Sequence, residues 1–183
     1  MIKKSVFCAD DKIYRPMSKT VRKTSGAFFK DLMVIHASLN TGVLILAAFF
    51  YYFSMESGAE EGEIPGWWST VAIVVAFAGV FFSAYTYKSN SLALRSNDNL
   101  SEKLVAYRKA SIASWIILDL AIIVNLAIYF INQNELLLYI ALFLVALMFL
   151  KRPSKGRTID SLDLGKKERE KIEDPDAVVI QIQ

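Results

Sequence analysis

The sequence has a single cysteine, Cys8, and a single histidine, His36, among its 183 residues. A lone cysteine excludes an intramolecular disulfide, and one cysteine with one histidine falls short of the four ligands of a typical structural zinc site. Glycine-rich phosphate loops, nucleophile elbows, HExxH motifs and paired-carboxylate motifs are also absent. We therefore predict a protein that is not an enzyme and has no catalytic residues, metal or cofactor.

Lysine and arginine are missing from residues 54–66 and 132–135, although the chain has 21 of them. Eight lie in residues 1–30, five in residues 88–109 and eight in residues 151–183. Cytoplasmic segments of membrane proteins carry the excess of cations, so the pattern predicts a cytoplasmic N-terminus, central loop and C-terminus. Because the cations flank apolar blocks and alternate with acids in the tail, nucleic-acid binding is not predicted.

Long apolar runs are abundant, and hydrophobic residues make up 54% of the chain, compared with about 45–50% in soluble domains. The predicted transmembrane spans are residues 32–53, 67–87, 111–131 and 135–151. The first three have about the 20 residues that a helix needs to cross a hydrocarbon core of about 30 Å. The fourth reaches that length only with Glu135 and Lys151 at the interfaces, and a buried helix or a re-entrant segment is the alternative.

The short connector at residues 132–134 favours a full fourth span, because it forces the third and fourth blocks into an antiparallel hairpin. No small-residue cleavage site follows the first block, so a retained helix is predicted rather than a signal peptide. The predicted fold class is an all-α membrane protein with four transmembrane helices arranged as two antiparallel hairpins. Its first partner is therefore the lipid bilayer.

The polar flanks complete the predicted organisation. The domains are a basic cytoplasmic arm (residues 1–30), a four-helix transmembrane domain (31–151) and a cytoplasmic tail (152–183). We expect the arm to be irregular up to about Val21. In the tail, opposite charges at i, i+4 spacing predict one short helix over residues 162–174, ending before Pro175. Residues 177–183 are β-prone, and we expect them to fray rather than pair with the sheet edge of a partner.

Apart from Glu135 at an interface, Asp119 is the one acidic residue in a predicted span, and it lies near the middle of residues 111–131. A carboxylate at that depth costs about 2.5–3.5 kcal/mol on insertion scales, so such residues commonly mark an ion or substrate site. The structural alternative is a protonated carboxyl group that hydrogen-bonds to a neighbouring helix.

His36 and Asn40 lie one turn apart in the first span. Asn40 is predicted at the depth of Asp119, and His36 about 5 Å nearer the cytoplasm, so the three side chains can form a polar cluster. A His–Asp pair could relay protons, because histidine titrates near neutrality. Hydrogen bonding of His36 to a carbonyl or a lipid headgroup is the structural alternative. Asn125, about 240° further round the helix from Asp119, is the fourth candidate polar residue and belongs to another face.

The second span carries small residues at spacings of 4, 3 and 4, namely Ala72, Ala76, Gly79 and Ser83. Small residues repeated in this way let two helix backbones approach closely in a membrane. The row predicts a helix-packing seam and indicates no chemistry.

Several short motifs lie around the last two spans: Tyr107-Arg108-Lys109-Ala110, Leu118-Asp119, Arg152-Pro153 and Asp163-Leu164. In this order they resemble a family of small four-span bacterial inner-membrane proteins whose activity is uncharacterised. The resemblance covers about residues 32–180 and implies four spans and an inner-membrane location. The chain departs from the pattern in having Asp119 where glutamate is common, and in a longer basic arm.

Two classes of function follow. The leading hypothesis is a non-enzymatic membrane protein that acts as a subunit, accessory or oligomeric scaffold of a membrane assembly, with a second copy or another membrane protein as partner. The alternative is a proton- or ion-coupled transport protein that uses Asp119 as a membrane-embedded carboxylate.

Overall fold

The computed structural model describes residues 21–57, 66–93 and 99–182. Four long helices run side by side: α1 (Ser25–Ser57), α2 (Trp67–Ala93), α3 (Leu100–Asn132) and α4 (Glu135–Leu150). The shorter elements are β1 (Val21–Thr24), α5 (Lys155–Leu162), α6 (Lys166–Glu173) and β2 (Val178–Ile182). The described chain is thus almost entirely helical, as the all-α prediction requires, with the addition of one small sheet.

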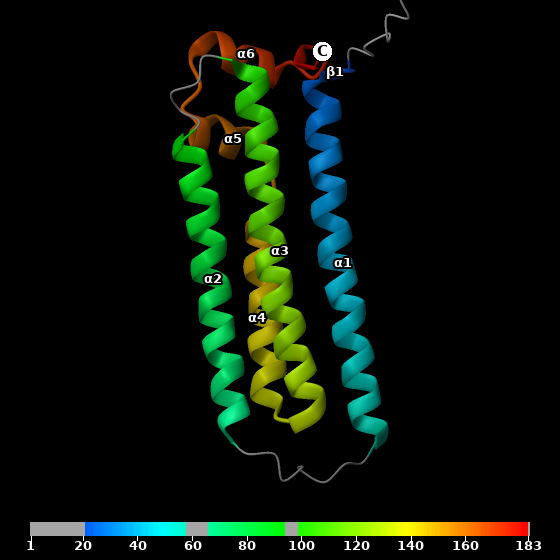
Figure 1. Cartoon of the computed structure of the whole chain (residues 1–183). Coiled ribbons are helices and arrows are strands. Elements are labelled where there is room, and N and C mark those ends of the chain that lie inside the picture. Colours follow the sequence, from blue (N-terminus) through cyan, green and yellow to red (C-terminus); the bar gives the residue numbers. More distant parts are fainter. Residues whose placement is uncertain (1–20, 58–65, 94–98, 183) are drawn as a thin grey trace, which may run out of the picture.

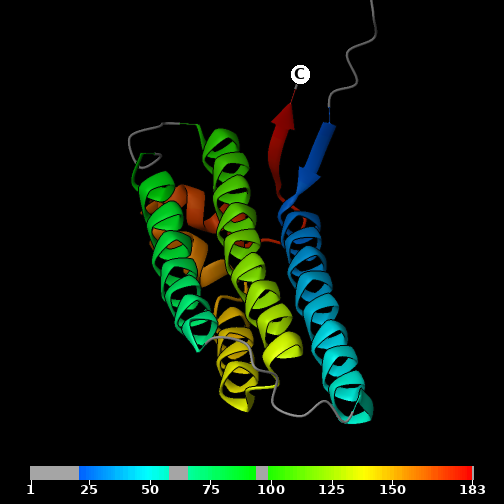
Figure 2. The ribbon, with the colours of Figure 1, turned by 60° about the horizontal axis from the view of Figure 1, so that its bottom comes forward.

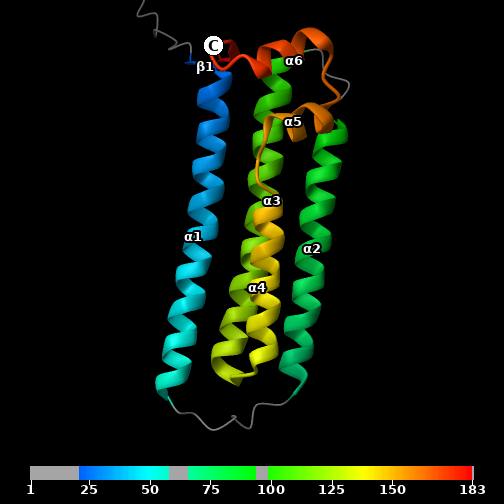
Figure 3. The ribbon, with the colours of Figure 1, turned by 180° about the vertical axis from the view of Figure 1, so that it is seen from behind.

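Helix α3 is the centre of the bundle (Figure 1). It contacts α1, α2 and α4, and its contact with α2 is the most extensive. Helix α4 packs against the face of α3 that is turned away in Figure 1, and it stands in front of α3 in the view from behind (Figure 3). Much of the core comes from α3, including Leu104, Leu118, Ile122 and Leu126, each fully buried. A helix with neighbours on three sides buries more of its surface than the outer helices do.

Three helices, α1, α2 and α3, are long and apolar enough to cross a membrane. The short α4 passes the same test only together with α5, from which it is separated by a bend of 80°. Its 16 residues span about 24 Å at 1.5 Å per residue. This is shorter than a hydrocarbon core of about 30 Å, so the residues just beyond Leu150 must lie close to the interface if α4 crosses a bilayer.

The connection between α3 and α4 is tight. Gln133 adopts a left-handed conformation with φ of 50°, and its N–H donates to the Tyr129 carbonyl. The Asn134 side chain then caps α4 by accepting from the N–H of Leu136 at 3.0 Å. These two caps end one helix and begin the next within a few residues, so α3 and α4 run in opposite directions.

The short elements β1, α5, α6 and β2, residues 21–24 and 155–182, form a cap at one end of the bundle (Figure 1). The start of α1, the end of α2 and the start of α3 lie at this cap end, and the shorter α4 runs toward it (Figure 1). The described residues of the three cation-bearing segments therefore gather there.

Strand β2 corrects the expectation that the C-terminal stretch frays. It pairs in antiparallel register with β1, with Lys23 opposite Ile180 (Figure 2). Val179 and Ile180 are buried, and the N–H groups of Ser25 and Gly26 donate to the carbonyls of Ala177 and Pro175, each at 2.9 Å. Residues 177–182 find both a sheet partner and an apolar surface within the same chain, and this pairing opposes fraying.

The tail also differs from the single predicted helix over residues 162–174. Ser154 begins an additional helix, α5, by accepting from the N–H of Arg157 at 3.3 Å. Asp163 ends α5 in a left-handed conformation with φ of 50°. Residues 166–173 then form α6, and α1 already begins at Ser25, inside the segment predicted as an arm.

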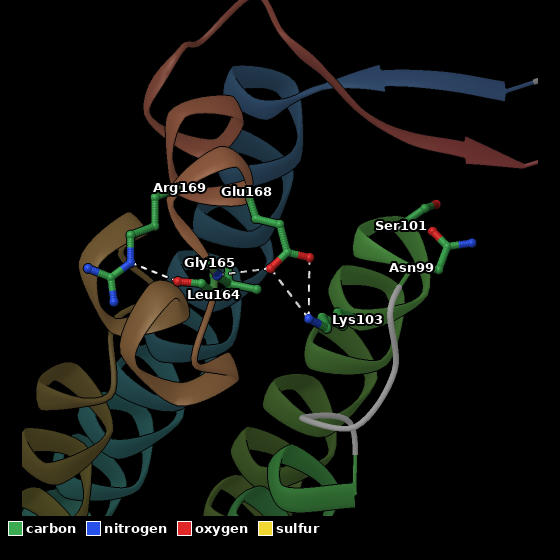
Figure 4. Close-up of polar contacts among 7 residues, drawn as sticks. All are labelled: Asn99, Ser101, Lys103, Leu164, Gly165, Glu168 and Arg169. Atoms are coloured by element: carbon green, nitrogen blue, oxygen red, sulfur yellow. Dashed lines mark hydrogen bonds and ion pairs between the residues drawn. The ribbon is translucent and has the colours of Figure 1, made fainter.

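The cap is attached to α3 by a partly buried ion pair (Figure 4). The Lys103 ammonium lies 3.2 Å from the Glu168 carboxylate, and its side chain is only 8% exposed. The same carboxylate accepts from the N–H of Gly165 at 3.1 Å, and Arg169 donates to the Leu164 carbonyl at 2.8 Å. Among the described residues, the ion pair that α6 forms is with α3 and not between its own i, i+4 side chains.

Candidate functional site

His36 and Asn40 are buried together on α1, with 4% and 2% of their surfaces exposed. His36 Nε2 donates to the Met148 carbonyl on α4 at 3.0 Å, so in a neutral ring Nδ1 is the acceptor. Asn40 Nδ2 donates to the His36 carbonyl at 2.8 Å, and the His36 ring packs edge-on against Trp115 of α3 with centroids 4.8 Å apart. These contacts join three helices, as expected for a structural histidine.

Asp119 is partly exposed near the middle of α3. Its Oδ1 atom is covered by the protein and has no hydrogen-bond partner. Within the part of the chain that the structure describes, no hydrogen bond joins Asp119 to His36 or Asn40. The predicted cluster therefore divides into a bonded His36–Asn40 pair and a separate carboxyl group.

Asn125 is completely buried. Its Nδ2 donates to the Ala121 carbonyl one turn earlier at 2.8 Å, within α3, and its Oδ1 has no partner. This bond stays within one helix, so Asn125 does not join the candidate cluster.

Ala72, Ala76, Gly79 and Ser83 all lie on the buried side of α2. Gly79 packs against Ala121 of α3 so closely that a Cβ on Gly79 would collide with that of Ala121. Only glycine permits this approach, because any side chain would have to displace the α3 backbone. The structure places Gly79 and Ser83 of this row at the α2–α3 contact.

Ser83 has a second role that sequence spacing does not reveal. Its hydroxyl lies 2.7 Å from the Ser114 hydroxyl and 2.8 Å from the Ser114 carbonyl. Lys151 Nζ, just past the end of α4, donates to the same Ser83 oxygen at 2.6 Å. The three residues come from α2, α3 and the end of α4, so no local motif in the sequence could have grouped them.

No group of three or more His, Cys, Asp or Glu side chains that could hold a metal ion occurs among the described residues. Comparisons of the chain with protein-family models, curated proteins and solved structures found no match.

Proposed function

We propose that this chain is a four-span integral protein of the bacterial inner membrane, with its N-terminus, central loop and C-terminus in the cytoplasm. The outward-facing surface of the helices supports a membrane location, because it carries large apolar side chains such as Phe77, Phe81 and Leu150, which are 74%, 66% and 76% exposed. Continuous apolar surface of this kind marks a membrane or protein contact. The gathering of cation-bearing segments at the cap end supports the orientation.

Within this membrane we infer that the protein acts without catalysis, as a subunit, accessory or oligomeric scaffold of a larger assembly. The polar side chains of the helices support a structural role. His36, Asn40, Ser83 and Asn125 donate to backbone carbonyls of their own or neighbouring helices. The His36 and Ser83 bonds join two helices, and such bonds stabilise helix packing in a membrane. The Asn40 and Asn125 bonds stay within α1 and α3.

The assembly proposal rests on the surroundings of the Asp119 carboxyl group. Its Oδ1 lacks a partner, yet the residue is partly exposed at the side of α3. An unsatisfied polar group in hydrocarbon costs several kcal/mol, so a hydrogen bond from a second membrane protein or a second copy would stabilise the complex. Rotation of the carboxyl group can present either oxygen to such a partner.

The test is purification of the full chain in a mild detergent, followed by mass measurement of the intact complex. We expect a stoichiometric partner or a homo-oligomer in the wild type. Asp119→Asn keeps a neutral hydrogen-bonding group of the same shape and should retain the complex. Asp119→Leu should weaken association about 5- to 30-fold, because an interhelical hydrogen bond is worth about 1–2 kcal/mol. A wild-type protein that remains monomeric would contradict the proposal.

A proton- or ion-coupled transport protein is the second candidate, and it is favoured by the same unpaired carboxyl group. If Asp119 binds and releases a proton or a cation, Asp119→Asn should abolish function as completely as Asp119→Leu, because an amide does not titrate. A carbodiimide should then label Asp119 in a pH-dependent manner. The Asn variant thus separates the two functions, since it preserves assembly but not transport.

A further inference from the structure

A cavity of about 150 Å³ lies at the cap end, between α2, α3 and the junction of α4 with α5. The polar residues that line it are Tyr87, Tyr107, Ser111, Ser114, Lys151 and Arg157. About 10–15 Å³ of such space is enough for one water molecule, so the cavity can hold a group of several heavy atoms. Its lining offers hydroxyl groups and cations and no carboxylate.

Neither Lys151 nor Arg157 has an anionic partner among the described residues. The ion pairs in the described part of the chain join Lys23 to Asp31 and Lys103 to Glu168, so neither Lys151 nor Arg157 is neutralised by a carboxylate. Two like charges that share a cavity repel each other, and an anion between them would relieve this repulsion.

Both cations keep donors for a ligand. Arg157 uses Nη1 to bond to the Leu150 carbonyl at 3.0 Å, and a guanidinium has five N–H donors. Lys151 gives one of its three protons to Ser83 at 2.6 Å. This bond holds the ammonium at the cavity wall while its other protons remain available.

The hydroxyl group of Ser111 also indicates a ligand in this cavity, independently of the two cations. It lines the cavity and is 2% exposed, yet its hydroxyl oxygen makes no hydrogen bond. The Tyr107 side chain lies near Ser111, but no hydrogen bond joins the two residues. A buried hydroxyl without a partner is costly, and the oxygen of a bound anion would accept its proton.

We propose that this cavity binds a phosphate group, held by Lys151, Arg157 and Ser111. A phosphate presents several acceptor oxygens in a compact tetrahedron, and arginine and lysine are the side chains that bind it by charge-assisted hydrogen bonds. The group comes from an anionic lipid headgroup or from a soluble phosphate. This site is separate from Asp119 and goes beyond the proposed role in assembly.

The test uses the full chain, freed of lipid in a neutral detergent, and follows thermal unfolding by tryptophan fluorescence. One arm adds inorganic phosphate against sodium chloride at equal ionic strength. The other adds phosphatidylglycerol against diacylglycerol, which lacks the phosphate. The variant Lys151→Gln/Arg157→Gln removes both cations, and Lys109→Gln/Arg152→Gln is the control, because it removes the same charges outside the cavity.

At about a hundredfold excess of ligand over Kd, we expect the wild-type midpoint to rise by about 5–10 °C in at least one arm. A rise with phosphatidylglycerol alone assigns a lipid headgroup, and a rise with inorganic phosphate assigns a soluble anion. The cavity variant should raise the half-saturating concentration about tenfold or more, and the control should leave it unchanged. Ser111→Ala, which removes one hydroxyl, should raise it about fivefold.

A wild type that neither ligand stabilises would overturn the proposal. Equal loss of the response in the cavity variant and the control would do so too, because it would indicate nonspecific charge attraction. If the cavity variant does not fold, Ser111→Ala decides the question, since an unchanged half-saturating concentration would exclude this cavity.

Discussion

The contact between Gly79 and Ala121 gives a sharp test of the α2–α3 interface. A methyl group on Gly79 would overlap the Ala121 methyl group, whereas a Cβ on Gly42, in α1, has no heavy atom within 4 Å. Gly79→Ala and Gly42→Ala therefore make the same chemical change inside a helix. One occurs at a closed interface and the other in open space.

The expected difference in stability follows from these surroundings. Both substitutions gain helix propensity, about 0.8–1.0 kcal/mol in water, and this gain largely cancels in the comparison. Only Gly79→Ala forces α2 and α3 apart, and overpacking of this kind costs about 1–3 kcal/mol. At about 2–4 °C per kcal/mol for a chain of this size, the Gly79→Ala midpoint should lie about 2–12 °C below that of Gly42→Ala.

The assay is thermal unfolding of the purified full-length variants in one detergent. The double variant Gly79→Ala/Ala121→Gly moves the methyl group from one helix to the other, so it should recover most of the loss, with a favourable coupling in the mutant cycle. Equal midpoints for Gly79→Ala and Gly42→Ala would refute the close approach of α2 and α3. A double variant less stable than the sum of its parts would refute the Ala121 contact.

Two further predictions concern the orientation and the cap. A reporter that is active only outside the cytoplasm should be active when fused after Glu61 and silent after Ser96 or Gln183, and activity at Gln183 would mean that α4 does not span. Glu168→Ala leaves the Lys103 ammonium buried without its partner. The loss should destabilise the cap by about 1–3 kcal/mol, which is less than the cost of breaking a fully buried ion pair. It should also speed proteolysis of the tail. Lys103→Met with Glu168→Leu should restore most of that stability, and cleavage at the wild-type rate in Glu168→Ala would show that the pair does not hold the cap.

Long apolar blocks predicted the positions of α1, α2 and α3 well, because each block must be helical to satisfy its backbone in hydrocarbon. The helices extend beyond the predicted spans. Helix α3 begins at Leu100, where Asn99 accepts from the N–H of Ser101 at 3.0 Å, eleven residues before the predicted third span. Hydropathy cannot detect the polar first turns of a helix, although the Asn99 cap is a signal for them.

Pairings between distant residues were the part that the sequence could not reveal. The β-prone character of residues 178–182 was visible, but their partner, β1, lies at the other end of the chain. Likewise Ser83 fits a row of small residues on α2, and nothing local indicates that its hydroxyl meets Ser114 and Lys151. Local patterns predict elements, whereas contacts between elements depend on the packed structure.

The short length of α4 explains why two cations meet at one cavity. Helix α4 has only 16 residues, so it ends beside the middle of α2, where Lys151 donates to Ser83 at 2.6 Å. The bend of 80° after Leu150 then turns α5 back across the bundle end and brings Arg157 to the same cavity as Lys151. A longer α4 would move Lys151 past Ser83 and carry α5 away from this cavity, so the two cations would no longer share it. The bend thus brings both cations to one cavity, as the proposed phosphate site requires.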